Sequence, residues 1–206
     1  MARMGTGFRT GVVPRENACM TVRIELATDR DWLNVRTAFG PRASNPDSCW
    51  CQRFRLHDSP TNEEALRTEL HSADVPIGLL AYLNDQPVGW TRVVPRNTLS
   101  GIVGNTALQR LLEDDAAAWW VTCVNLRREA RGRGIGAELL KAAVDHARAH
   151  GANTVDGHPV DKDRLKGNPS PAALFTGTLS MFTAAGFHEL GRTYPSRPVM
   201  RRVVVR

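Results

Sequence analysis

Long apolar runs are missing from this sequence of 206 residues. No stretch approaches the roughly 20 apolar residues that a membrane-spanning helix requires, so we expect no membrane partner. The first residues carry Arg3, Arg9 and Arg15 but lack the apolar segment of a secretory signal. We therefore expect residues 1–19 to form a loose tail, with Met20 as an alternative start, and residues 20–206 to form a single domain.

Cysteine is scarce as well. Cys19, Cys49, Cys51 and Cys123 give no recognisable disulfide framework. The Cys-Trp-Cys triplet lacks the two intervening residues that are typical of structural zinc sites. We therefore expect reduced thiols, no metal ion and a cytoplasmic location.

Aromatic residues are missing from the positively charged segments. The formal net charge is +6, with local excesses over residues 127–133 and at Arg201, Arg202 and Arg206. Neither excess is interleaved with aromatic side chains as in grooves that bind single-stranded nucleic acid. Nucleic acid is thus the less favoured partner, and solvated surface charge plus one anion site is the preferred interpretation.

The residues that are present predict a mixed α/β fold. Hydrophobic residues make up 42% of the chain, which is enough for a substantial core. Apolar periodicity and turn residues set the expected elements, and Asn84-Asp85 suits a hairpin turn. Strands are expected at 22–26, 77–82, 87–94, 119–124, 154–160, 187–190 and 199–205. Helices are expected at 28–39, from Ser59-Pro60 onward, once within 97–115, at 135–151 and from Ser170-Pro171 to Gly186.

A glycine-rich turn at residues 131–136, Arg-Gly-Arg-Gly-Ile-Gly, joins the buried strand 119–124 to an amphipathic helix. The first turn of a helix presents free N-H groups and the positive end of its dipole, which hold phosphate anions. The glycines permit positive φ and close approach of a ligand. Arg131 and Arg133 add charge that suits phosphate oxygens. The turn therefore predicts a diphosphate ligand.

A dinucleotide-binding fold is an alternative interpretation of this turn. Such a site has Gly-x-Gly-x-x-Gly and an acidic residue about 20 positions later, where Asp156 stands relative to Gly136. The spacing of Gly132, Gly134 and Gly136 differs from that pattern, however. A hairpin precedes the turn in place of further βαβ units, so an NAD-type site is disfavoured.

Two motifs together carry a family resemblance. Arg131, Gly134 and Gly136 fit Arg-x-x-Gly-x-Gly, and Met-Phe-Thr-Ala-Ala-Gly-Phe follows at 181–187. This pair resembles the motifs of the GNAT acetyltransferases, and the order of expected elements agrees over about residues 21–205. The resemblance implies a central, mostly antiparallel twisted sheet with one parallel strand pair, flanked by helices. It also implies an acetyl-CoA dependent N-acetyltransferase.

The resemblance implies where acetyl-CoA binds as co-substrate. Backbone amides of the turn would bind its pyrophosphate, and the end of the preceding strand would pair with its amide-bearing pantetheine arm. The thioester would then lie at a gap between strands 119–124 and 154–160. The implied cofactor-binding residues are Val124, Asn125, Leu126, Arg131, Gly132, Arg133, Gly134, Ile135 and Gly136.

The catalytic groups are less well indicated. In the family a tyrosine of the last helix often gives the leaving thiolate its proton, but this chain has Phe182 there, so Ser180, Cys123 or water would substitute. No glutamate lies on strand 119–124, which leaves His158 or Asp156 as the base. His158 could instead be a structural histidine bound to backbone groups. Cys123 is more typical of a small core residue than of a nucleophile, which favours direct transfer.

The expected acceptor is a primary amine of a small molecule, such as an antibiotic or a metabolite. Trp50, Phe54, residues 90–96 and Tyr194 would select it, although core packing explains such aromatic residues equally well. The alternatives are a protein N-acetyltransferase and a CoA-binding or sensing module without efficient catalysis, since Phe182 and the lack of a clear base argue against rapid turnover. By analogy alone, a sheet edge would allow a homodimer.

Overall fold

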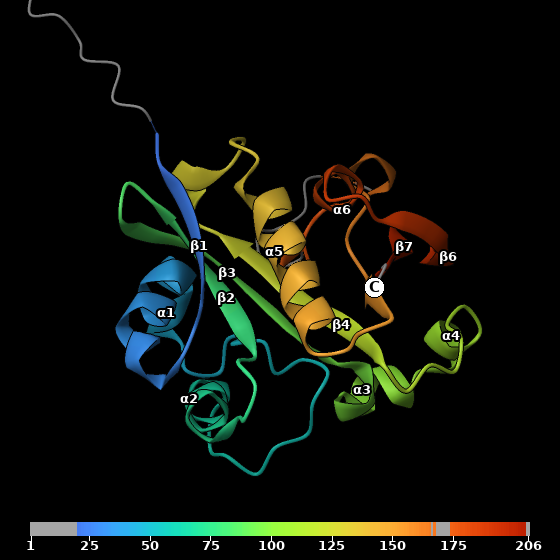
Figure 1. Cartoon of the computed structure of the whole chain (residues 1–206), viewed down its shortest axis with the longest axis horizontal. Coiled ribbons are helices and arrows are strands. Elements are labelled where there is room, and N and C mark those ends of the chain that lie inside the picture. Colours follow the sequence, from blue (N-terminus) through green and yellow to red (C-terminus); the bar gives the residue numbers. More distant parts are fainter. Residues whose placement is uncertain (1–19, 166, 168–173, 205–206) are drawn as a thin grey trace, which may run out of the picture.

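A single seven-stranded sheet organises the chain. The computed structural model describes residues 20–165, 167 and 174–204, so the predicted tail lies outside it. All neighbouring strands run antiparallel except the parallel pair β4–β5, which confirms the predicted fold class (Figure 1). In spatial order the strands are β1 (Val22–Leu26), β2 (Gly78–Leu83), β3 (Gln86–Pro95), β4 (Ala118–Leu126), β5 (Thr154–Gly157), β7 (Arg197–Val203) and β6 (His188–Tyr194).

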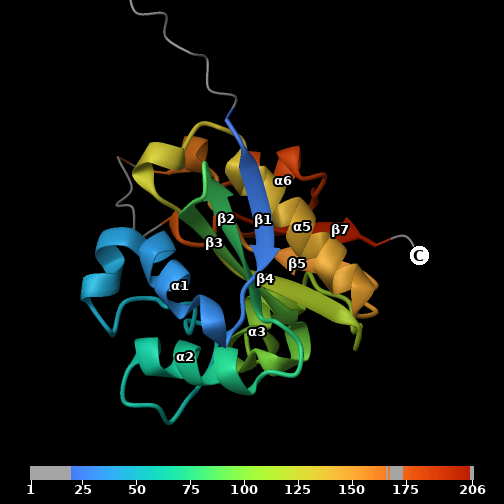
Figure 2. The ribbon, with the colours of Figure 1, turned by 60° about the vertical axis from the view of Figure 1, so that its left-hand side comes forward.

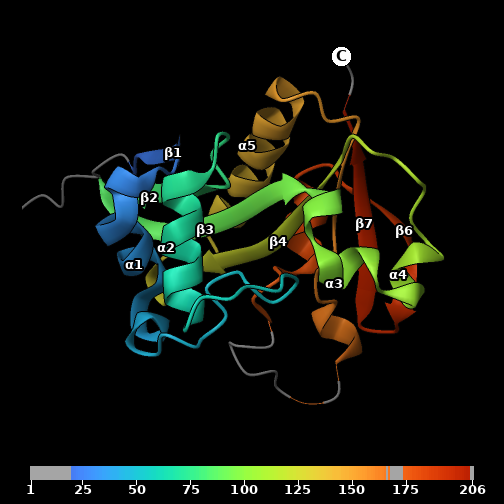
Figure 3. The same ribbon diagram turned by 90° about the horizontal axis from the view of Figure 1, so that it is seen from below.

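Helices cover both faces of the sheet. The helices are α1 (Trp32–Phe39), α2 (Asn62–Ser72), α3 (Ser100–Val103), α4 (Thr106–Gln109), α5 (Ile135–Ala149) and α6 (Leu179–Ala184). Helices α5 and α6 pack on one face, and α1 to α4 pack on the other (Figures 2 and 3). Among the described helices, none is both long and apolar enough to cross a membrane.

Local signals place most of these elements close to their predicted positions. Asn84 and Asp85 both have positive φ, as the predicted β2–β3 hairpin turn requires. Helix α2 begins after Thr61, later than predicted, because the Thr61 hydroxyl accepts the N-H of Glu64 at 3.2 Å. The segment 97–115 forms two short helices where one was expected.

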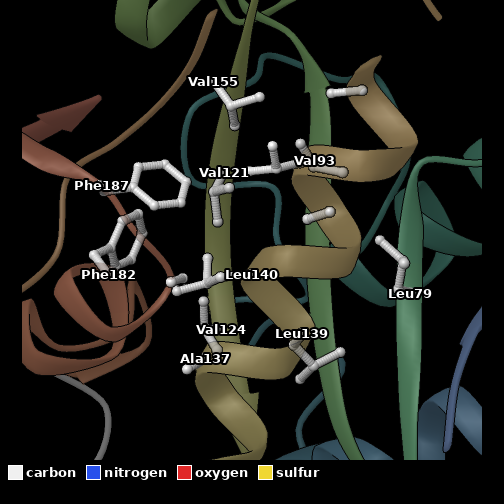
Figure 4. Close-up of a cluster of buried hydrophobic side chains, with 14 of the residues drawn as sticks. Leu79, Val93, Val121, Val124, Ala137, Leu139, Leu140, Val155, Phe182 and Phe187 are labelled. Carbon is white, nitrogen blue, oxygen red and sulfur yellow. The ribbon is translucent and has the colours of Figure 1, made fainter. Parts of the chain in front are cut away.

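Helix α5 supplies most of one core. Its apolar side chains, including Leu139 and Leu140, face Val93 and Val121 of the central strands (Figure 4). The helix ends before Gly151, which has φ +80° and so stops it as predicted.

Strands β4 and β5 diverge after a short parallel stretch. All nine residues of β4 are buried, and a β-bulge places Thr122 between Val121 and Cys123, which pair with Val93 and Arg92. Strand β5 pairs only through Gly157, so the predicted strand 154–160 was too long. The split therefore begins at Thr122.

Residues 174–178 fill part of this split. The N-H of Val124 in β4 donates to the carbonyl of Phe175 at 2.8 Å, and the N-H of Val160 donates to Gly177 at 3.0 Å. Gly177 has φ +82°, and a Cβ there would lie 3.1 Å from the ring of Phe182. Because residues 174–177 form a turn, closed by the N-H of Gly177 on the carbonyl of Leu174 at 3.0 Å, the prediction of a helix continuing from Ser170 to Gly186 is wrong here. Helix α6 begins only at Leu179, and Ser170 lies outside the described residues.

A disulfide corrects the expectation of reduced thiols. Cys51, in the loop between α1 and α2, is bonded to Cys123 of β4, with Cα atoms 6.2 Å apart. Both residues are 2% exposed. Seventy-two positions separate them in sequence, so spacing alone offered no sign of the pairing. Cys123 therefore has no free thiol for catalysis, and its proposed catalytic role is wrong.

Reduction of this disulfide should weaken the fold. We expect the free energy of unfolding to fall by about 2 to 4 kcal/mol, because the cross-link restricts a long loop of the unfolded chain. Urea denaturation with and without a strong reductant measures the change. The Cys49→Ser variant is the control and should keep the full reductant effect, since Cys49 takes no part in the disulfide. Equal midpoints with and without reductant in the wild type would contradict the assignment.

Candidate functional site

A pocket of about 510 Å³ lies where the end of β4 meets the glycine-rich turn and α6. Gly134 caps α5 with φ +77°, and Gly132 has φ +74°. A Cβ at either glycine would meet no atom within 4 Å, so this turn borders open space. The lining residues are Arg42, Val124, Asn125, Leu126, Arg131, Gly132, Gly134, Ile135, Gly136, Ala137, Lys162, Leu174, Phe175, Thr178, Ser180, Met181 and Ala184.

The pocket is built for an anion. Arg42, Arg131 and Lys162 line it, and its described lining contains no acidic residue. The first turn of the fifteen-residue helix α5 adds free N-H groups and its positive dipole end. Gly132 and Gly134 let the backbone approach a ligand without a side chain in the way. A polyphosphate therefore fits the residues present.

The structure brings together all but one of the predicted cofactor-binding residues. The exception is Arg133, whose Nε donates to the carbonyl of Glu129 at 3.2 Å and whose guanidinium contacts the sulfur of Met20. Arg131 does line the pocket, and its Nε donates to the carbonyl of Leu126 at 3.3 Å. The motif lies at a turn that borders the pocket, but the sequence could not tell which arginine lines it.

Two of the predicted strand residues already have internal partners. The N-H of Val124 is bound to Phe175, so a ligand that pairs with Val124 must first displace that carbonyl. The side-chain amide of Asn125 donates to the carbonyl of Ala38 at 2.8 Å. Asn125 thus ties β4 to the end of α1.

Of the three predicted catalytic residues, Ser180 alone lines the pocket. Its hydroxyl lies 3.0 Å from that of Thr178, which also lines the pocket. His158 lies outside the lining and its Nε2 is 2.8 Å from the hydroxyl of Thr193. Burial, with a smaller contribution from Arg197, lowers the pKa of His158 to about 4. His158 is therefore neutral at neutral pH and a weak base.

His158 should make stability depend on pH. The unfolded state takes up a proton on this residue below about pH 6.5, but the folded state does so only near pH 4. Its stabilising contribution is thus complete above pH 6.5 and lost as the pH falls to 4. We expect the protonation of His158 to lower the free energy of unfolding by about 2 kcal/mol between pH 7 and pH 5, as measured by urea unfolding. If the free energy of unfolding of His158→Asn falls as much over this range as that of wild type, the lowered pKa of His158 is contradicted.

Other predicted groups have structural partners. Asp156 is fully buried and accepts hydrogen bonds from Arg96 and Arg201, so it is held as an ion-pair acceptor. Phe182 is fully buried against Phe187 and lies outside the pocket lining.

The aromatic residues expected to select the acceptor divide in the same way. Trp50 and Trp90 are fully buried in the core that faces α1 and α2, so the packing alternative holds for them. Tyr194 is 70% exposed.

Sequence reasoning missed Arg42, Lys162 and Thr178 as lining residues. Arg42 lies in a 3-10 turn after α1, and Lys162 follows β5, so both are remote from the motif in sequence. Only the folded arrangement places them beside the turn.

Comparison with known proteins identifies one family. A sequence profile of the Acetyltransferase (GNAT) family matches residues 45–164, more than half of the chain. No curated protein sequence matches the chain.

Several solved structures share the fold. The aminoglycoside acetyltransferase AAC(6')-Ib in complex with coenzyme A is 15% identical, with a TM-score of 0.53 over 89% of this chain and 95% of that chain. A GNAT-family acetyltransferase from Streptococcus pneumoniae is 17% identical, with a TM-score of 0.52 over 90% and 100%. The ribosomal-protein-S18-alanine N-acetyltransferase from Escherichia coli is 11% identical, with a TM-score of 0.50 over 90% and 96%. At these identities the likeness concerns the fold.

Proposed function

Because this chain belongs to the Acetyltransferase (GNAT) family and is an acetyl-CoA dependent N-acetyltransferase, we propose that it acetylates a primary amine of a small molecule by direct transfer. The observation that supports the proposal is the pocket at the start of α5, which has three cationic side chains and no acidic residue in its described lining. When bound, acetyl-CoA supplies the thioester that carries the acetyl group. Every other contribution comes from the residues of this chain.

Different residues of the pocket would bind different parts of acetyl-CoA. The amides of the glycine-rich turn, with Arg131, hold phosphate oxygens. The end of β4 orients the rest of the molecule by main-chain pairing, with Val124 exchanging Phe175 for the ligand. This exchange replaces one hydrogen bond by another, so its cost is small. The split between β4 and β5, which begins after the pair Val121 and Gly157, would give the acceptor amine access to the thioester.

The thiols of the chain support direct transfer. A covalent acyl-enzyme requires an activated nucleophile, and of the side chains that can serve, a cysteine is the most nucleophilic at neutral pH. Cys123 is bonded to Cys51, and no cysteine belongs to the described pocket lining. In the proposed reaction the acceptor amine therefore attacks the thioester directly, without an acetyl-enzyme intermediate.

Ser180 is our candidate for the proton donor to the leaving thiolate. It lines the pocket, and the hydroxyl of Thr178 can donate a hydrogen bond to the hydroxyl of Ser180. We expect Ser180→Ala to lower kcat about tenfold, with KM for acetyl-CoA nearly unchanged, because thiolate is a fair leaving group that water can also protonate. Release of free thiol under steady-state conditions measures both constants. Thr183→Ala, one turn along α6, is the control variant and should keep wild-type kcat.

A panel of primary amines tests the proposed function. Each amine is incubated with acetyl-CoA and protein, and both free thiol and acetylated product are quantified. We expect at least one small-molecule amine to yield thiol and product in equal amounts. Thiol release that occurs only with protein or peptide amines would move the function to protein acetylation. Tight acetyl-CoA binding without any amine-dependent thiol release would favour a sensing module instead.

A further inference from the structure

We propose that Arg42, which no motif of the chain includes, binds a phosphate group of acetyl-CoA together with Arg131. This inference rests on the proposed placement of the cofactor in the pocket. It also gives Arg42 the charge-supplying role that the sequence predicts for Arg133. Arg42 lines the pocket, whereas the guanidinium of Arg133 is turned toward Glu129 and Met20.

The backbone of Arg42 is held in place from two sides. Its carbonyl accepts the N-H of Asn45 at 3.2 Å and the hydroxyl of Ser48 at 3.1 Å. The preceding helix α1 is fastened to β4 by the hydrogen bond from Asn125 to Ala38. Since Asn125 itself lines the pocket, the position of Arg42 is fixed relative to the proposed cofactor site.

The electrostatics of Arg42 favour an anion beside it. Burial lowers the pKa of its guanidinium, Cys49 opposes this effect, and the positive charge of Arg131 lowers the pKa further. Two guanidinium groups that repel one another across a pocket without described acidic residues gain most from a shared anion. A phosphate offers several oxygens, so both arginines can donate to the same group.

Acetyl-CoA offers two sources of this chemistry, its diphosphate and its 3'-phosphate. Calorimetric titration of Arg42→Gln with acetyl-CoA and with the analogue that lacks the 3'-phosphate separates them. A contact with the diphosphate lowers the affinity for both ligands by the same factor. A contact with the 3'-phosphate lowers the affinity for acetyl-CoA alone. We expect a loss of about tenfold to a hundredfold for acetyl-CoA in either case.

Matched variants decide the assignment. Arg133→Gln removes the same charge from an exposed side chain that lies outside the pocket lining and contacts Glu129 and Met20. It should stay within about twofold of wild type, because salt screens an exposed charge. Arg42→Lys keeps the charge and should recover part of the lost affinity, which guards against a folding defect in Arg42→Gln. Wild-type affinity in Arg42→Gln would overturn the proposal, as would an equal loss in Arg133→Gln. Either result leaves the proposed function standing if Gly134→Glu still abolishes binding, whereas failure of the wild type to bind acetyl-CoA would remove both.

Discussion

Substitution of Gly134 by glutamate should weaken acetyl-CoA binding by about a hundredfold or more. Gly134 is the N-cap of α5, and its missing Cβ faces open space in the pocket. A carboxylate there would repel the phosphates that the turn and Arg131 attract. Calorimetry at constant ionic strength measures the change, because part of the interaction is screened by salt.

Gly151 provides a matched control for this substitution. It stands after the other end of α5, with φ +80° against +77° for Gly134, and a Cβ there would also meet no atom within 4 Å. Glutamate at either position meets the same backbone strain of about 1 kcal/mol. Gly151→Glu should match wild type in acetyl-CoA binding, and it should be the less stable of the two variants by about 1 kcal/mol, because the helix dipole favours a carboxylate at the start of α5 and disfavours one at its end. Equal binding by the two variants would remove the turn from the cofactor site.

Asp156→Asn should lower the free energy of unfolding by about 3 to 5 kcal/mol. Asp156 is fully buried in β5, where Arg201 binds it at 2.7 Å and Arg96 binds it at 3.0 Å. Loss of the negative charge leaves two nearly buried guanidinium groups without their shared counterion. Urea unfolding at pH 7 measures the loss.

Glu113 is the control for Asp156, because it pairs with the same Arg201 at 2.8 Å but its side chain is 81% exposed. Surface pairs of this kind contribute little, so Glu113→Gln should cost less than about 1 kcal/mol. If Asp156→Asn proves equally mild, the buried network is not a stabilising unit. If Asp156→Asn folds well and loses turnover with its stability intact, Asp156 is the base after all.

Much of the framework could be predicted because local chemistry determines it. The alternating strand β1, the Asn84-Asp85 turn and the amphipathic α5 each carry their signal within a few residues. The glycine-rich turn belongs to the same group, since positive φ at Gly132 and Gly134 is a local requirement. The same turn borders the pocket that we propose as the cofactor site.

The rest depends on contacts between distant segments. Cys51 meets Cys123, and Arg42 comes to line the same pocket as Arg131, only once α1 and its following loop pack on the sheet. The turn at Phe175 interrupts the predicted helix, and its carbonyls at Phe175 and Gly177 accept the N-H groups of Val124 and Val160 from distant parts of the chain. Neither periodicity nor spacing reports such pairings.

Amide resonances of the labelled protein, followed by NMR during titration with acetyl-CoA, test the central claim most directly. The account predicts saturable shifts at residues 131–137, where the turn and the start of α5 line the pocket, and at Val124, whose N-H leaves the carbonyl of Phe175. Resonances around Gly151 should stay in place. Saturable shifts confined to other surfaces, with the turn and Val124 unchanged, would contradict the account.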